Sequence, residues 1–196
     1  MVVIITSMEI PTVSVSDDYF SELKNLLAVA TTRPKLYEAV VNAPFHDPRR
    51  TTMLGLGITV LLLVNKRDKM IDRVALANTD MAAGFLEMSA KPFSEIRIPL
   101  GYKKNFIARA IIDKHYMITS DWQYIFNPVL TPEEARFNQA GGGIDCSVVY
   151  PLIGAGDGGA MIFSYYEGLD RITKEHHNFM SRYCIMVSKA LNSLSD

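Results

Sequence analysis

Apolar residues near the start of the chain recur at helical spacing behind a polar cap. The segment Ser16-Asp17-Asp18 comes first, and the apolar positions that follow it are Phe20, Leu23, Leu27 and Ala30. Serine and aspartate cap the free amides of a first helical turn, so this stretch predicts a helix. Pro34 is expected to end or kink that helix, and residues 36–41 favour a second helix that stops near Pro44.

Two pairs of apolar runs, each interrupted by a short turn, predict β-hairpins. Residues 58–64 and 70–77 are apolar and flank a polar turn. The second pair consists of residues 145–153 and 160–166, which are joined by the glycine-rich turn 154–159. Strands joined by tight turns pair antiparallel, and glycine supplies the positive φ that such turns use.

Shorter patterns fill the region between the hairpins. Residues 79–91 and 105–114 carry apolar side chains at helical spacing and predict two short helices. Residues 96–100 and 116–119 are apolar without that spacing, so we expect them to be extended. The middle of the chain is therefore predicted to be irregular, with short helices and short strands.

Two further helices are predicted by their first turns and their apolar faces. The segment Thr131-Pro132-Glu133-Glu134 has a capping threonine, an early proline and two acids at the positive end of the helix dipole. That helix is expected to stop at Gly141-Gly142-Gly143. Residues 173–194 predict the last helix, whose apolar stripe consists of Phe179, Tyr183, Met186, Val187, Ala190 and Leu194.

This order of elements predicts an α+β fold. Consecutive strands joined by tight turns imply a mainly antiparallel sheet rather than a doubly wound parallel one. Helices at both ends of the predicted domain imply a helical layer on one face of that sheet. We expect a single domain over residues 16–196, preceded by an N-terminal extension of residues 1–15.

Composition and charge exclude several classes of protein. The 196 residues are 48% hydrophobic and 21% charged, with a formal net charge of −1, which suits one globular domain. This balance favours neither a nucleic acid nor an anionic membrane as a partner. The longest apolar run, residues 54–64, is about half of the roughly 20 residues that span a bilayer. Two cysteines form no disulfide framework, so we expect a reducing, cytoplasmic location and no secretory signal.

Motifs for catalysis and metal binding are missing from the sequence. Gly141-Gly142-Gly143 lacks the Lys and Ser/Thr of a phosphate-binding loop and is better explained as a helix end. No Gly-x-Ser-x-Gly elbow occurs, and Lys66-Arg67 and Lys103-Lys104 are expected on solvated turns. We therefore expect no catalytic residue and no metal site. The four histidines have no metal-ligand spacing; they are His46, His115, His176 and His177.

Three segments together resemble a GAF domain, a sensory module that binds small molecules. The segment ITVLLLVNKRDKMIDRVALA is similar to the first two strands of that family, and NFIARAIIDKHYMITSDW to a short helix, the third strand and a following aspartate. CSVVYPLIGAGDGGAMIFSYYEG is similar to the last hairpin. Asn105 departs from the pattern, because many members have glycine there. The resemblance implies a sheet of five or six antiparallel strands, with terminal helices on one face and a ligand pocket roofed by loops and short helices on the other.

The resemblance also directs attention to candidate ligand-binding residues. Asp121 and Trp122 follow a short strand on the expected pocket side, where a carboxylate accepts hydrogen bonds and an indole stacks on a flat ring. The alternative is a capping aspartate beside core aromatics. The full candidate set is Asp121, Trp122, Tyr124, Phe126, Cys146, Phe163 and Tyr165.

Cofactors are not specified by the sequence. Cys146 is not followed by the histidine that bilin-attaching members commonly have, and a haem would require a histidine such as His115, so we expect neither cofactor. A GAF-fold methionine-sulfoxide reductase would need a reactive Cys146 and a resolving Cys184. The simpler interpretation is that both are small buried residues.

Our leading hypothesis is a non-enzymatic sensory domain that binds a small organic ligand and signals through its terminal helices. The apolar stripes of these helices predict a homodimer, and a separate signalling protein is a further expected partner. The alternative is a protein–protein interaction module with a vestigial pocket. A redox enzyme that uses Cys146 is the third hypothesis.

Overall fold

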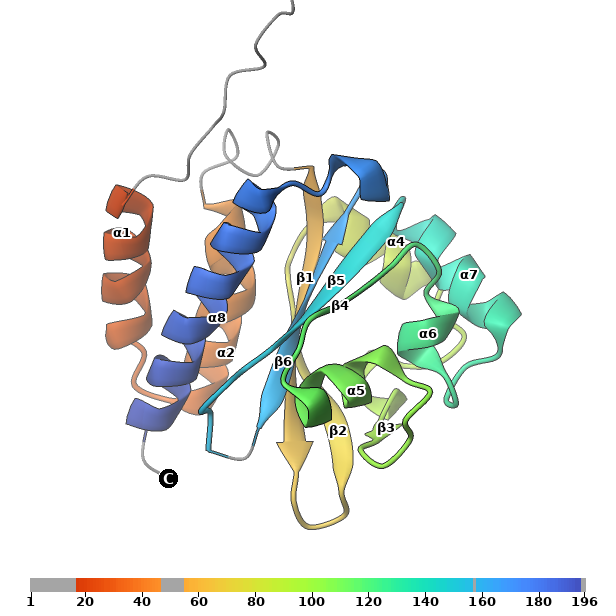
Figure 1. The fold of residues 1–196 in the computed structure, drawn as a ribbon, viewed down its shortest axis with the longest axis horizontal. Coiled ribbons are helices and arrows are strands. Elements are labelled where there is room, and N and C mark those ends of the chain that lie inside the picture. Colours follow the sequence, from red (N-terminus) through yellow and green to blue (C-terminus); the bar gives the residue numbers. More distant parts are fainter. Residues whose placement is uncertain (1–16, 47–54, 157, 195–196) are drawn as a thin grey trace, which may run out of the picture.

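The computed structural model describes residues 17–46, 55–156 and 158–194. The proposed extension of residues 1–15 therefore lies outside the described residues, as do residues 47–54. The elements follow one another along the chain as in Figure 1, and their bounds are α1 Asp17–Ala28, α2 Arg33–Asn42, the 3₁₀ helix η1 Ala43–Phe45, β1 Leu56–Asn65, β2 Met70–Leu76, α4 Asp80–Glu87, η2 Phe93–Glu95, β3 Ile98–Pro99, α5 Phe106–Asp113, β4 Met117–Thr119, α6 Gln123–Phe126, α7 Pro132–Gly141, β5 Cys146–Pro151, β6 Gly159–Tyr165, η3 Leu169–Arg171 and α8 Lys174–Ser193.

The six strands form one antiparallel sheet in the order β3-β2-β1-β6-β5-β4. Both predicted hairpins are present, as β1–β2 and β5–β6. The two hairpins join through β1 and β6, where Val60 lies opposite Ile162. The predicted α+β class, with its antiparallel sheet and terminal helices, is confirmed. Gly154 and Gly158 both have φ near +80° in the β5–β6 turn, as that glycine-rich segment predicts.

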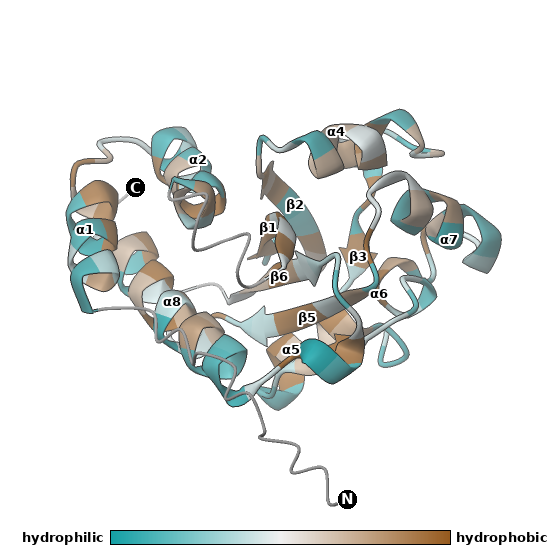
Figure 2. Cartoon of the chain, turned by 90° about the horizontal axis from the view of Figure 1, so that it is seen from above, coloured by the Kyte–Doolittle hydropathy of each residue, from teal (hydrophilic) through white to brown (hydrophobic). Residues whose placement is uncertain are grey.

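Helices cover both faces of the sheet. In Figure 2, α1, α2 and α8 lie on one side of the strands, and α4, α5, α6 and α7 lie on the other. We call these sides the terminal-helix face and the roof face. Successive residues of a strand point to opposite faces. Leu61 and Phe163 therefore pack under the terminal helices, whereas Leu62 and Ile162 pack under the roof.

The apolar stripe of α8 is buried inside the protein. Phe179, Tyr183 and Val187 are each at most 5% exposed and pack on the terminal-helix face. The Tyr183 hydroxyl donates a 2.6 Å hydrogen bond to the Val40 carbonyl, which fastens α8 to α2. The stripe that predicted a homodimer is thus largely occupied by intramolecular packing. A dimer formed through the terminal helices would have to use their outer faces.

The roof is tied together by capping residues. Asn105, which the resemblance marked as a departure, is fully buried at the start of α5. Its side-chain oxygen accepts hydrogen bonds from the amides of Ile107 and Ala108, and its side-chain nitrogen donates to the carbonyls of Ile125 and Asn127. The residue therefore caps one helix and clips the end of α6 to it.

Two of the departures from the sequence predictions concern α1 and α6. Pro34 does not end α1; that helix stops at Ala28, and Pro34 lies in the first turn of α2, where the missing amide proton costs nothing. The short helix α6, over Gln123–Phe126, was not predicted because one turn carries no periodic pattern. The predicted capping box is present at Thr131 and Glu134, and α7 ends in the glycine run as expected.

No helix within residues 17–46, 55–156 and 158–194 is both long enough and apolar enough to cross a membrane.

Candidate functional site

Trp122 lies in the middle of the roof face. Its side chain is 3% exposed, and its ring packs edge-on against Phe85, with 5.5 Å between the ring centroids. The indole nitrogen donates a 2.8 Å hydrogen bond to the Ser147 hydroxyl, which lies 2.7 Å from the Ser164 hydroxyl. The polar edge of the indole is therefore satisfied by the sheet beneath it, while its ring forms part of the apolar wall.

Asp121 acts as a local cap rather than pointing into the roof face. One carboxylate oxygen accepts the Gln123 backbone amide at 3.0 Å, and the other accepts the Gln123 side-chain amide at 2.8 Å. Arg136 approaches the second oxygen at 3.5 Å. Both oxygens thus have partners within the protein. This arrangement fits the capping interpretation that the sequence left open.

Tyr124 and Phe126 point in different directions although both belong to α6. Tyr124 is 42% exposed and stacks on Phe106, with 5.0 Å between centroids. Phe126 is 3% exposed and lies 5.4 Å from Trp122 and 6.2 Å from Phe85. Of these two candidates, only Phe126 contributes to the buried wall of the roof face.

The remaining three candidates lie on the opposite side of the sheet. Cys146, Phe163 and Tyr165 are fully buried on the terminal-helix face. The seven candidates therefore do not form one cluster, because these three positions point toward the terminal helices. The sequence indicated the strands but not which of their two faces was turned to the roof.

The environment of Cys146 is that of a buried thiol. Its sulfur donates to the Glu167 carbonyl at 3.4 Å, and burial raises the pKa of the thiol to about 11. Burial also raises the pKa of Cys184 far above the usual thiol range. Both cysteines are free. Neither side chain lies among the residues that build the roof face.

Sequence reasoning missed the most unusual side chain of the roof face, Arg73. This residue lies in the middle of β2, opposite Leu62 of β1, and is only 7% exposed. Its Nε and Nη1 atoms are buried without a hydrogen-bond partner. The detectable signal was a lone arginine in the predicted strand of residues 70–77, two positions from Ile71 and hence on the same face.

Three phenylalanine rings surround the Arg73 guanidinium. Its central carbon lies 4.2 Å from the ring centroid of Phe93, 5.1 Å from that of Phe85 and 5.2 Å from that of Phe126. We call these three rings and Arg73 the Arg73 cage. The negative faces of aromatic rings attract a cation, and this attraction strengthens away from water. The cage thus accommodates the charge but gives no acceptor for its N–H groups.

Burial acts on the charge of Arg73. It lowers the pKa of the guanidinium to about 9, which still leaves the group protonated at neutral pH. Burying a charge without a counter-ion is costly, and buried charges in proteins are normally paired. Among the residues that the structure describes, no carboxylate pairs with Arg73.

A β-bulge follows Arg73 directly. The register between β1 and β2 shifts at this point, so that Leu62 lies opposite Arg73 and Leu61 opposite Ala75. Val74 is the extra residue, and both Val74 and Ala75 pack toward the terminal-helix face. Bulges bend a strand and re-aim its side chains, and they are common beside functional sites. This bulge places two consecutive residues after Arg73, Val74 and Ala75, on the side of the helical layer.

The segment that carries Phe93 is held at both ends. Before it, the Lys91 ammonium donates a 2.8 Å hydrogen bond to the Val129 carbonyl. After it, Arg97 lies 2.6 Å from both Asp68 and Asp72. The hydrogen bond from Arg97 lowers the pKa of the Asp68 carboxyl. Phe93 is thereby kept over Arg73 as the partly exposed wall of the cage.

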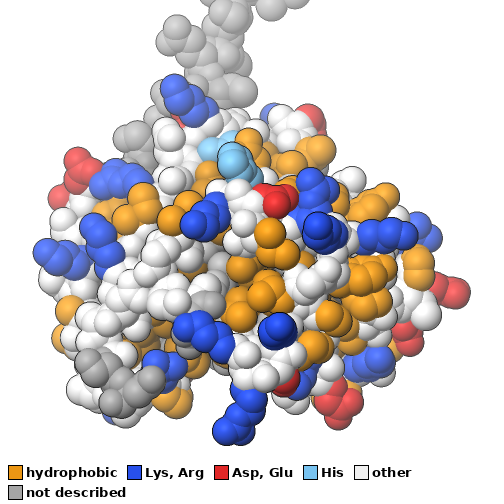
Figure 3. Space-filling model, turned by 60° about the horizontal axis from the view of Figure 1, so that its bottom comes forward, with side chains coloured by type: hydrophobic (Ala, Val, Ile, Leu, Met, Phe, Trp, Pro, Cys, Tyr) orange, Lys and Arg blue, Asp and Glu red, His pale blue; other side chains and the backbone are white. Residues whose placement is uncertain are grey.

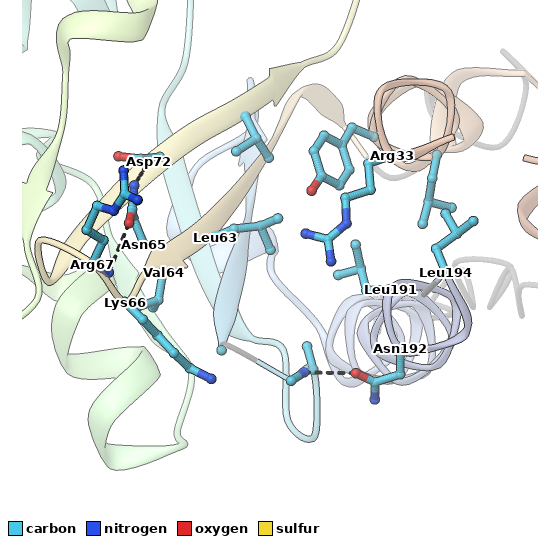
Figure 4. A pocket seen from close by; sticks show the side chains of 16 residues that line it. Arg33, Leu63, Val64, Asn65, Lys66, Arg67, Asp72, Leu191, Asn192 and Leu194 are labelled. Carbon is cyan, nitrogen blue, oxygen red and sulfur yellow. Dashed lines mark hydrogen bonds between the residues drawn. The ribbon is translucent and has the colours of Figure 1, made fainter. Parts of the chain in front are cut away.

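A separate groove of about 640 Å³ lies at the end of the molecule near the β1–β2 turn (Figure 4). Arg33 extends into it from α2, and Asp72 lines its opposite side. Three of its polar side chains are engaged within the protein: Asn65 donates to Asp72, and the Asn192 side chain bonds Gly154 and Gly156.

Lysine and arginine side chains gather around that end of the molecule (Figure 3). The basic pairs Lys66-Arg67 and Lys103-Lys104 are exposed there, as their expected placement on turns implies. Lys69 is also exposed and immediately precedes β2, four residues before Arg73. About 13 Å of extended chain separates these two positions.

Comparison with known proteins identifies the fold by structure alone. No family model matches the sequence, and no curated protein matches it. Among solved structures, the GAF domain of an Acinetobacter phosphoenolpyruvate-protein phosphotransferase is similar, with a TM-score of 0.62 and 8% identity over 89% of this chain and 91% of that chain.

Two further structures have other roles. A segment of a methyl-accepting chemotaxis protein aligns with a TM-score of 0.60 and 10% identity over 88% of this chain and 96% of that chain. A free methionine-R-sulfoxide reductase from Neisseria meningitidis, in complex with its substrate, aligns with a TM-score of 0.58 and 13% identity over 95% of this chain and 98% of that chain. Identities this low show the fold alone. The chain has the GAF fold.

Proposed function

We propose that this GAF-fold chain is a non-enzymatic sensory domain that binds a small organic ligand at the roof face and signals through its terminal helices. The observation that carries the proposal is Arg73, a buried cation with two unpartnered N–H-bearing nitrogens in the centre of that face. Functional sites are where proteins keep arrangements that cost stability. A ligand that supplied the missing acceptor would remove this cost and would bind by doing so.

A physical route connects the cage to the helices. Arg73 and Val74 are consecutive in β2 and therefore point to opposite faces of the sheet. Val74 packs in the core that also contains α2 and α8. The Val40 and Val41 carbonyls of α2 accept hydrogen bonds from Tyr183 of α8 and Thr59 of β1. A displacement of β2 at Arg73 would therefore change the packing of both α2 and α8.

The homodimer and the separate signalling protein remain proposals that rest on this route. Because the stripe of α8 packs inside the chain, a second copy would contact the outer faces of α1 and α8. The hydrodynamic mass at high micromolar concentration tests this proposal. A dimer is expected, and a strict monomer would remove self-association as the route of signalling. Both cysteines are free and buried, which fits the proposed cytoplasmic location.

The alternative is an interaction module whose site is filled by its own side chains. The observation that favours it is the cage itself, since three rings already cover the cation. In that case the Arg73 side chain fills the space between the three rings, and its removal leaves a cavity. If the chain is a sensory domain, the buried charge of Arg73 destabilises the unliganded protein, and a flexible apolar side chain at this position removes that destabilisation.

The free energy of unfolding of Arg73→Met separates the two functions. Under the sensory proposal we expect this variant to be as stable as the wild type or more stable by about 1–4 kcal/mol, the range found when buried ion pairs are replaced by apolar residues. If the chain is an interaction module, we expect Arg73→Met to lower the free energy of unfolding. Arg182→Met is the matched control, because Arg182 also lies over a ring, Phe20, at 4.0 Å but is exposed on α8. A loss in Arg73→Met well beyond that in Arg182→Met would overturn the sensory proposal.

A redox enzyme is the third function. Some of the similar structures are methionine-sulfoxide reductases, and one of these was solved in complex with its substrate. Against this function, the Cys146 thiol points to the terminal-helix face and burial raises its pKa to about 11. The thiolate is the nucleophile in such chemistry, and little of it exists at neutral pH under these conditions. We expect no turnover of free methionine sulfoxide; turnover abolished by Cys146→Ser would establish this function instead.

A further inference from the structure

The open bonding capacity of Arg73 is confined to the edges of its guanidinium. Phe85, Phe93 and Phe126 approach the group with their ring faces, so the cation's diffuse charge is already in contact with them. Rings accept no conventional N–H hydrogen bond of full strength. The Nε and Nη1 atoms therefore require an acceptor that enters between the rings.

The other buried polar side chains of the roof face are already engaged. Asn105 uses both its oxygen and its nitrogen, and Ser147 lies between the Trp122 indole and the Ser164 hydroxyl. Thr119 exchanges hydrogen bonds with the backbone of Asp121. Within the described part of the chain, Arg73 is thus the buried side chain of this face that still has donors to offer.

The single unpaired positive charge of Arg73 is best balanced by a ligand that carries one negative charge. A dianion such as phosphate would carry a second charge and further oxygens into a site that has no second cation or free donor among the described residues. A carboxylate is a planar monoanion that forms stronger hydrogen bonds than a neutral acceptor does, and it would engage Nη2 together with either Nε or Nη1, because Nε–H and Nη1 lie on opposite sides of the guanidinium. The surrounding rings and aliphatic side chains favour an apolar body attached to it.

We propose that the ligand of this domain is an organic monocarboxylate, whose carboxylate pairs with Arg73 and whose apolar body lies against Phe85, Phe93 and Phe126. This inference rests on the proposed sensory function and names the chemical class of its ligand. Phe93 is the cage ring that is partly exposed, so the ligand enters past it. The segment of Phe93 is anchored on both sides of this entry, by Lys91 on Val129 and by Arg97 on two aspartates.

The single tryptophan of the chain provides the readout. Trp122 lies 5.5 Å from Phe85 and 5.4 Å from Phe126, so its emission senses a change in the cage. We would titrate the full chain with acetate, hexanoate and benzoate at constant ionic strength and follow Trp122 fluorescence. Hexanamide and benzamide are the matched probes, because they keep the body and remove the charge.

The expected result is a saturable change with hexanoate or benzoate in the wild type and in the control Arg182→Met. Arg73→Met is expected to weaken that binding at least tenfold, and the amides to bind at least tenfold more weakly than their acids. Arg73→Lys, which keeps the charge but not the fork, is expected to lie between the wild type and Arg73→Met.

Two results would overturn the inference. Amides that bind as tightly as their acids would show a neutral ligand and leave the sensory proposal standing. No saturable response to any of the carboxylates at millimolar concentration would exclude the class. The sensory proposal itself is judged separately by the unfolding free energies of Arg73→Met and Arg182→Met, which need no ligand, so the two failures are distinguishable.

Discussion

Asp72 and Arg73 are neighbours in β2, but only the charged group of Asp72 has hydrogen-bond partners within the protein. The Asp72 carboxylate accepts a 2.6 Å hydrogen bond from Arg97 and another from Asn65. The Arg73 guanidinium, which leaves the sheet on the other face, has buried donors without partners. The carboxylate nearest to Arg73 in the sequence, that of Asp72, is therefore already hydrogen-bonded to Arg97 and Asn65. The sheet keeps the two charges apart, and the proposed carboxylate ligand would supply the missing partner of the cation.

The stability of the wild type should depend on pH in a way that Arg73→Met lacks. Burial lowers the pKa of Arg73 to about 9 in the folded chain, below its value in the unfolded chain. The unfolded state therefore binds more protons between these two values, and stability rises with pH across that interval. Below pH 9 the full cost of burying the charge is present. Urea unfolding of both proteins at neutral pH and above pH 9 measures this; an unchanged difference between them would contradict it.

Trp122 and Tyr124 provide a matched pair of truncations. Trp122→Ala removes a ring that is 3% exposed and leaves the Ser147 hydroxyl without its donor, so we expect a loss of about 3–5 kcal/mol. Tyr124→Ala removes a ring that is 42% exposed and stacks on Phe106, so we expect a loss of about 1 kcal/mol. Chemical denaturation gives both values. Equal losses would show that Trp122 is not the centre of the roof packing.

Asn105→Ala should destabilise the roof more than loss of an ordinary helix cap. The change removes the cap of α5 and also deprives the Ile125 and Asn127 carbonyls of their donor. We expect a cost of about 2–4 kcal/mol, because a lost cap and buried unsatisfied acceptors act together. Thr131→Ala is the control, since it removes an exposed cap alone and should cost about 0.5–2 kcal/mol. The finding of equal costs would argue against the clip between α5 and α6.

Both thiols should resist modification in the folded protein. Burial raises the pKa of Cys146 to about 11 and raises that of Cys184 further, so both remain protonated at neutral pH. A folded-state pKa above the unfolded value stabilises the fold at lower pH, and this contribution disappears as the pH rises through about 11. A chromogenic thiol reagent should react with two groups per chain only after urea is added. Rapid reaction of Cys146 without urea would revive the redox function.

The fold was predictable wherever the sequence repeats a pattern. Both hairpins, the capping box at Thr131 and the stripe of α8 follow from alternation, cap chemistry and helical spacing. The candidate site was predictable only in part. Trp122 and Phe126 lie on the roof face, but Phe163 and Tyr165 lie beneath the terminal helices.

The missed residues share a physical cause. Both faces of β6 are apolar and buried, so alternation gives no clue to which face meets the roof. Arg73 was overlooked because a charged residue in a strand is usually solvated. Its burial depends on Phe93 from a one-turn helix and on Phe85 and Phe126 from two other helices, a convergence that no local pattern encodes.

The lengths of the outermost strands limit how this protein assembles. β3 and β4, the two edges of the sheet, have only two and three residues. A long unpaired edge is a template on which another chain can add a strand, and proteins avoid aggregation by keeping such edges short. The short borders thus disfavour growth of the sheet from copy to copy. Self-association is left to the helices, the elements through which the domain is proposed to signal.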